Sequence, residues 1–274
     1  NIEFDHADIY NNLDEIILTF SRLLNVVPRN GLALINGDDP NCLIAARESP
    51  CPTKKVGFGE SCDLKISNIE YLPTGSCFVI EGEAYEVPMV GEFNVRNAAM
   101  AVCSARFAGL EPEEIRKGLL SFEGIARRQQ ERGEVGGITV VDDFAHHPTA
   151  IGLAIDGLRQ KYPSRRLWVI FEPRSNTTRR NIFQDDLAMA LKKADCVVIP
   201  SIPHPEKVAE NERLDPDKLV ADISSAGANS WYLGEVEEIV EHVSSLAQSG
   251  DVIAILSNGG FGGIHEKLLT SLSD

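Results

Sequence analysis

Two carboxylates and two imidazoles lie within six residues near the middle of the chain, in the segment VVDDFAHHPTA. The preceding β-branched run, residues 137–141, predicts a buried strand, and Pro148 with the apolar spacing after it predicts a helix. Asp142, Asp143, His146 and His147 should therefore lie at the carboxyl end of a strand, where α/β sheets collect ligands. They could ligate a metal, transfer protons or hold a ribose or amine. Alternatively, they are solvated residues that end a strand. Adjacent strand residues face opposite sides, so we expect that not all four reach one site.

Two asparagines and a histidine in the first half could also contact ligands. Asn94 and Asn97 lie three residues apart near the start of a predicted helix and so share a face. Paired amides can match the edge of a purine, although an asparagine near a helix start is often only a cap. His6, between Asp5 and Asp8, resembles a ligand for a hard cation, and a surface loop explains it equally well.

Arginines flank the central segment on both sides. Arg127 and Arg128 lie in the basic turn 126–133, just before the strand, and could neutralise phosphate. A solvated turn is the alternative. Arg174, Ser175 and Asn176 follow the next predicted strand, where they could cap a helix or contact a ligand.

The elements that must position these residues alternate between helix and strand. In the first half we expect a helix over 13–24, a strand over 32–35, a helix over 41–48 and a strand over 54–58. Residues 63–90 predict a small antiparallel sheet, and helices follow from Gly91 and from Pro112. We place a domain boundary near residue 130, giving domains 1–130 and 131–274.

The second half predicts a doubly wound, Rossmann-like domain of class α/β with a parallel sheet. Strands are expected at 138–142, 167–171, 196–200, 230–233 and 251–256, with helices at 149–161, 178–193, 215–226 and 235–248. The glycine-rich run from Ser257 to His265 lacks the third glycine of a dinucleotide loop, so it predicts a tight turn.

Composition excludes several classes of protein. The formal charge of -15 argues against nucleic acid or an anionic membrane as a partner. No apolar run is long enough to span a bilayer, and the six cysteines show no metal spacing, so we expect free thiols and a cytoplasmic location. The chain begins at Asn1 without a methionine, and we expect it to be a fragment of a longer protein.

Four segments in order, NIEFDHADIY, GEFNVRNAA, ARRQQERGE and VVDDFAHHPTA, resemble the ATP-dependent Mur ligases of bacterial cell-wall synthesis. FEPRSNTTRR and LSNGGFGGIH are most similar to the member that joins UDP-N-acetylmuramate to L-alanyl-γ-D-glutamyl-meso-diaminopimelate during peptidoglycan recycling. The nearest alternative is the member that adds L-alanine to the same nucleotide sugar. The resemblance implies part of the central ATPase domain followed by the whole C-terminal Rossmann-like domain.

The resemblance also implies cofactors and residue roles. Full-length Mur ligases use ATP and magnesium to activate a carboxylate as an acyl phosphate, which the amine then attacks. The resemblance assigns magnesium to His6, adenine to Asn94 and Asn97, and nucleotide phosphate to Arg127 or Arg128. It assigns the nucleotide or the amine to Asp142 or Asp143, the nucleotide to His146 and His147, and the peptide to Arg174, Ser175 and Asn176. No G-x-x-x-x-G-K-[ST] phosphate loop occurs in the chain, so we expect it to be inactive alone. A non-catalytic nucleotide- or peptide-binding module is the second hypothesis. The glycine pattern disfavours a third, a nicotinamide-dependent oxidoreductase.

Overall fold

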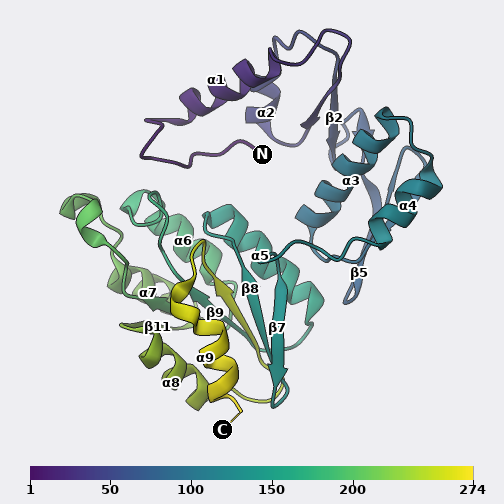
Figure 1. Cartoon of the computed structure of the whole chain (residues 1–274). Helices are drawn as coiled ribbons and strands as arrows, with labels where there is room; N and C mark the ends of the chain where they lie inside the picture. The colour runs from purple at the N-terminus through teal and green to yellow at the C-terminus, as the bar shows by residue number, and fades with distance from the viewer. Residues whose placement is uncertain (274) are drawn as a thin grey trace. The chain divides into compact units, whose positions relative to one another are not determined.

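The chain is described here by a computed structural model covering residues 1–273, in which it forms two compact units, Asn1–Glu123 and Gly124–Asp274 (Figure 1). Each unit has its own core and is described by itself. Arg127 and Arg128 belong to the second unit. Among the described residues no helix has the length and apolar character needed to cross a membrane.

The first unit contains a parallel and an antiparallel three-stranded sheet. The parallel sheet has the order β1 (Ala33–Asn36), β2 (Thr53–Gly57), β3 (Leu64–Lys65), and the antiparallel sheet has the order β4 (Ser67–Leu72), β5 (Gly75–Ile80), β6 (Glu83–Val87). The helices are α1 (Leu13–Leu24), α2 (Pro40–Ala45), α3 (Glu92–Phe107) and α4 (Pro112–Leu120). The antiparallel sheet expected over residues 63–90 is present, but it begins only at Ser67, so the prediction was wrong for the first residues of that range. Leu64 and Lys65 pair with β2 in parallel.

Helix α3 carries the paired asparagines of this unit. Its N-cap is Gly91, whose φ of 111° is a conformation that a side chain would strain. One face of the helix packs on the antiparallel sheet through Val95, Ala99 and Val102. The first turn of α3 is therefore held on the core, and Asn94 is buried with it.

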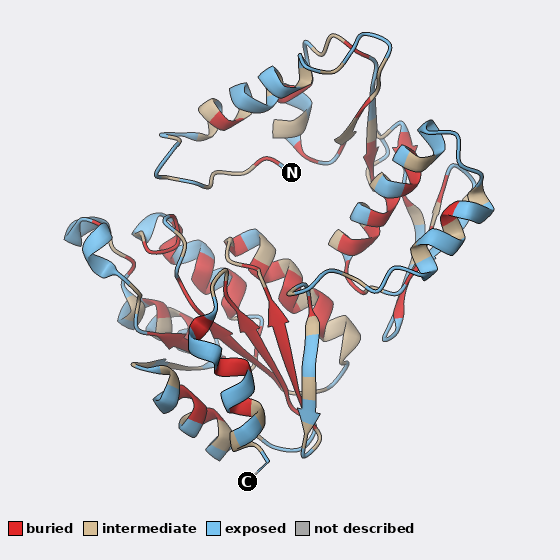
Figure 2. Ribbon diagram, in the orientation of Figure 1, coloured by how far each residue is buried: buried red, intermediate tan, exposed pale blue. Residues whose placement is uncertain are grey.

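The second unit is built on a six-stranded sheet of order β11-β10-β9-β12-β8-β7. The five parallel strands are β8 (Ile138–Asp143), β9 (Leu167–Phe171), β10 (Cys196–Pro200), β11 (Asn229–Leu233) and β12 (Val252–Leu256). Strands β8, β9, β10 and β12 are buried throughout (Figure 2), as expected of apolar strands covered on both faces.

Helices cover both faces of this sheet. Those in contact on one face are α5 (Pro148–Lys161), α6 (Gln184–Leu191) and α7 (Pro216–Ser225), and on the other α8 (Val236–Leu246) and α9 (Ile264–Ser271) (Figure 1). Short 3₁₀ turns, η1 (Asn181–Phe183), η2 (Pro205–Lys207), η3 (Glu210–Glu212) and η4 (Phe261–Gly263), lie in the connections. The predicted α/β doubly wound fold is confirmed, although the helix expected over 178–193 is shorter.

One edge strand was missed. Residues 126–133 were expected to form a basic turn, but Gln130–Val135 forms β7, antiparallel to β8. The strand is polar and mostly exposed, so it lacks the apolar alternation by which a strand is recognised. Its pairing with β8 shifts between Glu131 and Gly133, which leaves Arg132 as the extra residue of a bulge.

Candidate functional site

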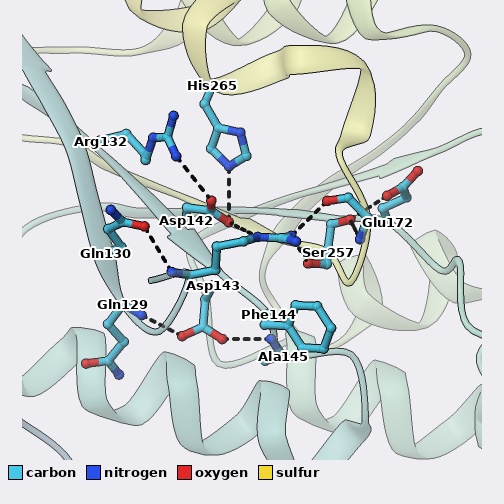
Figure 3. A network of polar contacts seen from close by, with 12 residues as sticks. Gln129, Gln130, Arg132, Asp142, Asp143, Phe144, Ala145, Glu172, Ser257 and His265 are labelled. Carbon is cyan, nitrogen blue, oxygen red and sulfur yellow. Dashed lines mark hydrogen bonds and ion pairs between the residues drawn. The ribbon is translucent and has the colours of Figure 1, made fainter. Parts of the chain in front are cut away.

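Asp142 and Asp143 are the last residues of β8, and their carboxylates contact different groups. Asp143 accepts hydrogen bonds from the backbone N–H of Gln129 (2.9 Å) and of Ala145 (2.7 Å). Asp142 instead lies beside β7 and α9 (Figure 3). Both are almost fully buried, at 2% and 3% relative exposure. The expectation that the cluster cannot converge on one point is therefore confirmed for the two aspartates.

Three cationic or ionisable side chains surround the Asp142 carboxylate. Its Oδ1 lies 3.4 Å from Nε of Arg127 and 3.3 Å from Nε2 of His265, and its Oδ2 lies 3.7 Å from Nη1 of Arg132. Arg132 reaches this position from the bulge in β7 and also pairs with Glu266. A buried carboxylate needs such partners to remain charged. Asp142 is thus the centre of an internal ion network.

The two arginines of the doublet have different environments. The Arg127 guanidinium donates from Nη2 to the carbonyl oxygens of Ser257 (2.5 Å) and Gly259 (2.8 Å), so it is bound inside the unit. Arg128 is exposed, and its guanidinium stacks over the Phe144 ring at 5.4 Å. Its backbone N–H donates to the Ile125 carbonyl (3.1 Å), but within residues 1–273 its guanidinium forms no hydrogen bond or salt bridge.

The backbone on either side of Arg128 is strained. Arg127 has φ 60° and Gln129 has φ 49°, both in the left-handed region that L side chains rarely adopt. Such strain persists only where surrounding contacts enforce it, and it concentrates at ligand sites. These contacts include the anchored guanidinium of Arg127 and the hydrogen bond from Gln129 N to Asp143. The turn therefore displays Arg128 outward while it binds Arg127 inward.

Burial raises the pKa of Asp143, although its two backbone hydrogen bonds and the charge of Arg128 act in the opposite direction. Burial lowers the pKa of His265, with the nearby Arg132 and Arg127 acting in the same direction and Asp142 opposing them. A histidine with a lowered pKa is neutral at pH 7. The site therefore holds a neutral imidazole against a carboxylate.

The two histidines of the central motif lie at the start of α5. His147 is the N-cap of α5, accepting a hydrogen bond at Nδ1 from the Thr149 N–H (3.3 Å), and its ring packs edge-on against Phe183. His146 lies with Nδ1 3.0 Å from the Phe144 carbonyl and its ring edge-on to that phenyl group. Capping explains the position of His147 without a ligand.

The Arg174 side chain rests on the glycine turn that follows β12. A Cβ placed on Gly259 would lie 2.6 Å from Nη1 of Arg174, so only glycine allows this close approach. Arg174 Nη1 is also 3.8 Å from Oε1 of Glu172, whose other oxygen accepts a hydrogen bond from the Ser257 hydroxyl. The carboxyl ends of β9 and β12 are thereby joined by polar contacts (Figure 3).

The loop after Arg174 contains one residue that the sequence did not single out. Ser175 and Thr178 hydroxyls contact each other at 2.8 Å, and Ser175 Oγ accepts from the Thr178 N–H, so Ser175 stabilises the turn. Arg179 is 6% exposed, its Nε has no hydrogen-bond partner, and burial together with Arg174 lowers its pKa. Buried positive charge of this kind attracts an anion. Glu172 and His265 were also missed, since both are remote in sequence from the central motif, and Arg132 was missed because residues 126–133 were interpreted as a turn.

In the first unit the two asparagine amides do not serve the same purpose. Asn94 is buried and donates from Nδ2 to the Val90 carbonyl at 2.8 Å, whereas Asn97 is exposed. Between them, Arg96 donates to Asn36 Oδ1 (2.6 Å) and Asp38 Oδ2 (2.7 Å). The N-cap of α3 is Gly91, so neither asparagine is the cap that the sequence offered as the alternative: Asn94 is bound inside the helix, and Asn97 is the amide that is exposed.

His6 lies in the loop before α1 with φ 55°, is exposed, and has Nε2 3.9 Å from Asp5 Oδ2. Among residues 1–273 no three histidine, cysteine, aspartate or glutamate side chains are grouped as a metal site would require. The six cysteines are free. His6 and Asp5 by themselves do not fit a magnesium site, because that ion prefers several oxygen ligands.

Known proteins share both halves of this chain. Residues 1–105 match the Mur ligase middle domain, and residues 127–259 match the family described as Mur ligase, glutamate ligase domain. The chain belongs to the Mur ligase family. The resemblance predicted from the ordered motifs is therefore confirmed, as is the fold it implied.

Three similar proteins illustrate the relationship. The UDP-N-acetylmuramate–L-alanyl-γ-D-glutamyl-meso-2,6-diaminoheptandioate ligase of Escherichia coli is 38% identical over 100% of this chain and 58% of its own length. The UDP-N-acetylmuramate–L-alanine ligase of Desulfitobacterium hafniense is 28% identical over 98% and 60%. The crystal structure of a murein peptide ligase from Psychrobacter arcticus is 30% identical with a TM-score of 0.69, over 97% of this chain and 56% of that one. The chain thus spans a little more than half the length of these relatives.

Proposed function

We propose that this chain is the middle and C-terminal part of a cytoplasmic, ATP-dependent ligase of peptidoglycan recycling. In the complete enzyme, ATP activates the carboxylate of UDP-N-acetylmuramate as an acyl phosphate. The α-amine of L-alanyl-γ-D-glutamyl-meso-diaminopimelate then attacks that carbonyl, phosphate leaves and an amide bond forms. The observation that carries this assignment is the 38% identity to the E. coli tripeptide ligase along the whole chain, against 28% to the L-alanine ligase of D. hafniense and 32% to that of Salinibacter ruber.

For the nucleotide we propose Arg128 as the phosphate ligand and Asn97 as the adenine ligand. Arg128 is exposed, is displayed by a strained turn, and has no internal salt bridge among the described residues. A guanidinium so placed can bind phosphate oxygens in a bidentate manner. Arg127 and Asn94, whose polar groups are bound within the chain, are proposed to support these contacts from behind.

Asp143 is the carboxylate that we propose to orient the nucleotide or the amine, because Asp142 contacts the charged side chains of Arg127 and Arg132, whereas Asp143 accepts hydrogen bonds from the backbone N–H groups of Gln129 and Ala145. His146, whose ring lies edge-on to Phe144, is proposed to border the nucleotide. His6 alone cannot hold the magnesium ion that ATP chemistry requires, so we attribute no step to a metal held by these residues.

For the peptide we propose Arg174 as a carboxylate ligand, with Arg179 supplying additional positive charge. Burial lowers the pKa of Arg179, as does its neighbour Arg174, and a bound carboxylate would relieve both effects. Ser175 shapes the turn, and Asn176 lies 3.5 Å from Nη1 of Arg179 through its Oδ1. The tripeptide carries several carboxylates, whereas L-alanine has only one.

A binding titration of this chain tests the proposal. We expect the tripeptide to bind and L-alanine to bind far more weakly, with Arg174→Ala weakening tripeptide affinity by about tenfold or more through loss of a charged hydrogen bond. Lys193→Ala is the matched control, since Lys193 is exposed to the same degree (42% against 44%) and has one carboxylate partner, Asp156. Preference for L-alanine would contradict the assignment.

The purified chain used for the titration also tests whether the chain is inactive alone. We propose that it does not turn over ATP, because no phosphate loop with its lysine occurs within the 274 residues. Robust ATP hydrolysis by the purified chain would refute the proposed inactivity. It would not affect the assignment of the peptide, which the binding titration tests separately.

A further inference from the structure

A continuous polar chain connects α9 to the glycine turn that carries Arg174. His265, in the first turn of α9, contacts Asp142 Oδ1 at 3.3 Å, and the same oxygen lies 3.4 Å from Nε of Arg127. Arg127 then donates to the carbonyls of Ser257 and Gly259. Figure 3 shows His265 and Arg132 converging on Asp142 from one side. These groups come from four separate segments of the chain.

The chemistry of His265 fixes the direction of its contact with Asp142. Burial, Arg132 and Arg127 lower the pKa of the imidazole against the opposing charge of Asp142, and Glu266 next to it is paired with Arg132. An ionised carboxylate only accepts hydrogen bonds, so the Nε2 that faces it must carry the proton. Within residues 1–273 this buried Nε2 has no partner that meets hydrogen-bond geometry, so the Asp142 oxygen 3.3 Å away is held by an electrostatic contact. His265 therefore presents a neutral N–H to Asp142.

The far end of this chain determines where Arg174 can lie. Gly259 contacts the guanidinium closely enough that a methyl group would displace it. Ser257 reaches the same guanidinium indirectly, since its hydroxyl donates to Glu172, which pairs with Arg174. Both carbonyls that Arg127 binds belong to these two residues. A shift of the turn would thus move Arg174 by two routes.

We propose that His265 is a positioning residue for peptide binding, which acts through Asp142 and Arg127 to hold the turn 257–259 under Arg174. It restrains Asp142, so that the carboxylate keeps Arg127 on both carbonyls. The inference rests on the proposed function, because Arg174 is the peptide ligand proposed above. His265 contacts neither the peptide nor the nucleotide in this proposal, but it sets the position of Arg174, which contacts the peptide.

The experiment combines tripeptide titration with NMR of the arginine Nε–H groups of Arg127 and Arg174. His265→Leu keeps the side-chain volume but removes the donor, and His265→Gln restores a donor. We expect His265→Leu to weaken tripeptide binding about 5- to 10-fold, the loss typical of one hydrogen bond in a charged network, and to shift both arginine resonances. His265→Gln should recover most of the affinity and both resonances. If His265→Leu does not fold, His265→Asn, whose shorter amide cannot reach Asp142, replaces it.

Two further variants separate the steps. Gly259→Ala should weaken binding and shift the Arg174 resonance more than that of Arg127, because its methyl group meets the Arg174 guanidinium directly, whereas Arg127 contacts only the Gly259 carbonyl. His242→Leu is the control, since His242 packs on Trp231 and is outside this network. Unchanged affinity and unchanged resonances in the donor-lacking His265 variant would overturn the inference while the proposed function stands. If the unsubstituted chain binds no tripeptide, the proposed function fails, and the arginine resonances alone decide whether His265 positions Arg174.

Discussion

Replacing Arg127 and Arg128 one at a time by methionine should separate a structural arginine from a ligand-binding one. Methionine keeps an unbranched apolar stem in each case and removes only the guanidinium. At position 127 that group contacts Asp142 and two backbone carbonyls, and at position 128 it is exposed over Phe144. We therefore expect a large loss of stability from the first substitution and almost none from the second.

The size of the effect follows from the contacts. Each hydrogen bond from a charged donor contributes about 1.5–3 kcal/mol, and Arg127 donates two to backbone carbonyls. Its side chain is 30% exposed, so water replaces part of what is lost, while Asp142 retains Arg132 and His265. We estimate a loss of about 3 kcal/mol for Arg127→Met, which lowers Tm by roughly 6–12 °C in a unit of this size. Arg128→Met should stay within about 0.5 kcal/mol.

Tryptophan fluorescence during urea unfolding is the appropriate assay. The chain has two tryptophans, Trp168 and Trp231, and both lie in the second unit with their rings stacked at 5.5 Å. The signal therefore follows unfolding of residues 124–274 without interference from the first unit. In parallel, ADP titration measures the ligand: we expect Arg128→Met to weaken binding more than Arg127→Met in samples that are folded.

The outcome that refutes this reasoning is equal destabilisation by the two variants, or a loss below about 1 kcal/mol for Arg127→Met. Either would mean that the inward hydrogen bonds of Arg127 contribute little, and that the doublet cannot be divided into one anchored and one displayed arginine.

Two further predictions concern other residues of the site. Stability of the second unit should fall as the pH drops below about 6.5, because unfolded His265 takes up a proton that the folded state, with its lowered pKa, resists. His265→Gln should flatten this dependence between pH 7.5 and 5.5 in the tryptophan assay, and an unchanged slope would contradict it. Asn94→Ala should destabilise the first unit by about 1–2 kcal/mol through loss of the buried hydrogen bond to Val90, whereas Asn97→Ala should leave stability unchanged and weaken nucleotide binding. Amide hydrogen exchange in α3 measures the loss of stability, and equal protection of α3 in the two variants would refute the different roles of Asn94 and Asn97.

Much of the fold could be predicted from local patterns. Strands β8, β9, β10 and β12 are short apolar runs bounded by turns, and each occurs close to its predicted position. Helix α5 begins at Pro148 as its sequence indicates. Strand β7 could not be found in this way, because it pairs at an exposed sheet edge with polar residues and a bulge. Its existence depends on a neighbouring strand rather than on its own composition.

The order of the four motifs was sufficient to identify the family, since each motif is a contiguous segment that can be recognised without knowledge of the fold. The sequence also indicated that Asp142 and Asp143 face opposite sides of the sheet. Which of them contacts two arginines and a histidine was decided only by folding, because Arg132 and His265 belong to β7 and α9. Arg127 bonds to the Ser257 carbonyl across 130 positions of sequence. How far a side chain is buried and which groups it contacts are properties of packed elements, so only the tertiary structure could divide the arginine doublet and the asparagine pair into an internal and an outward-facing member.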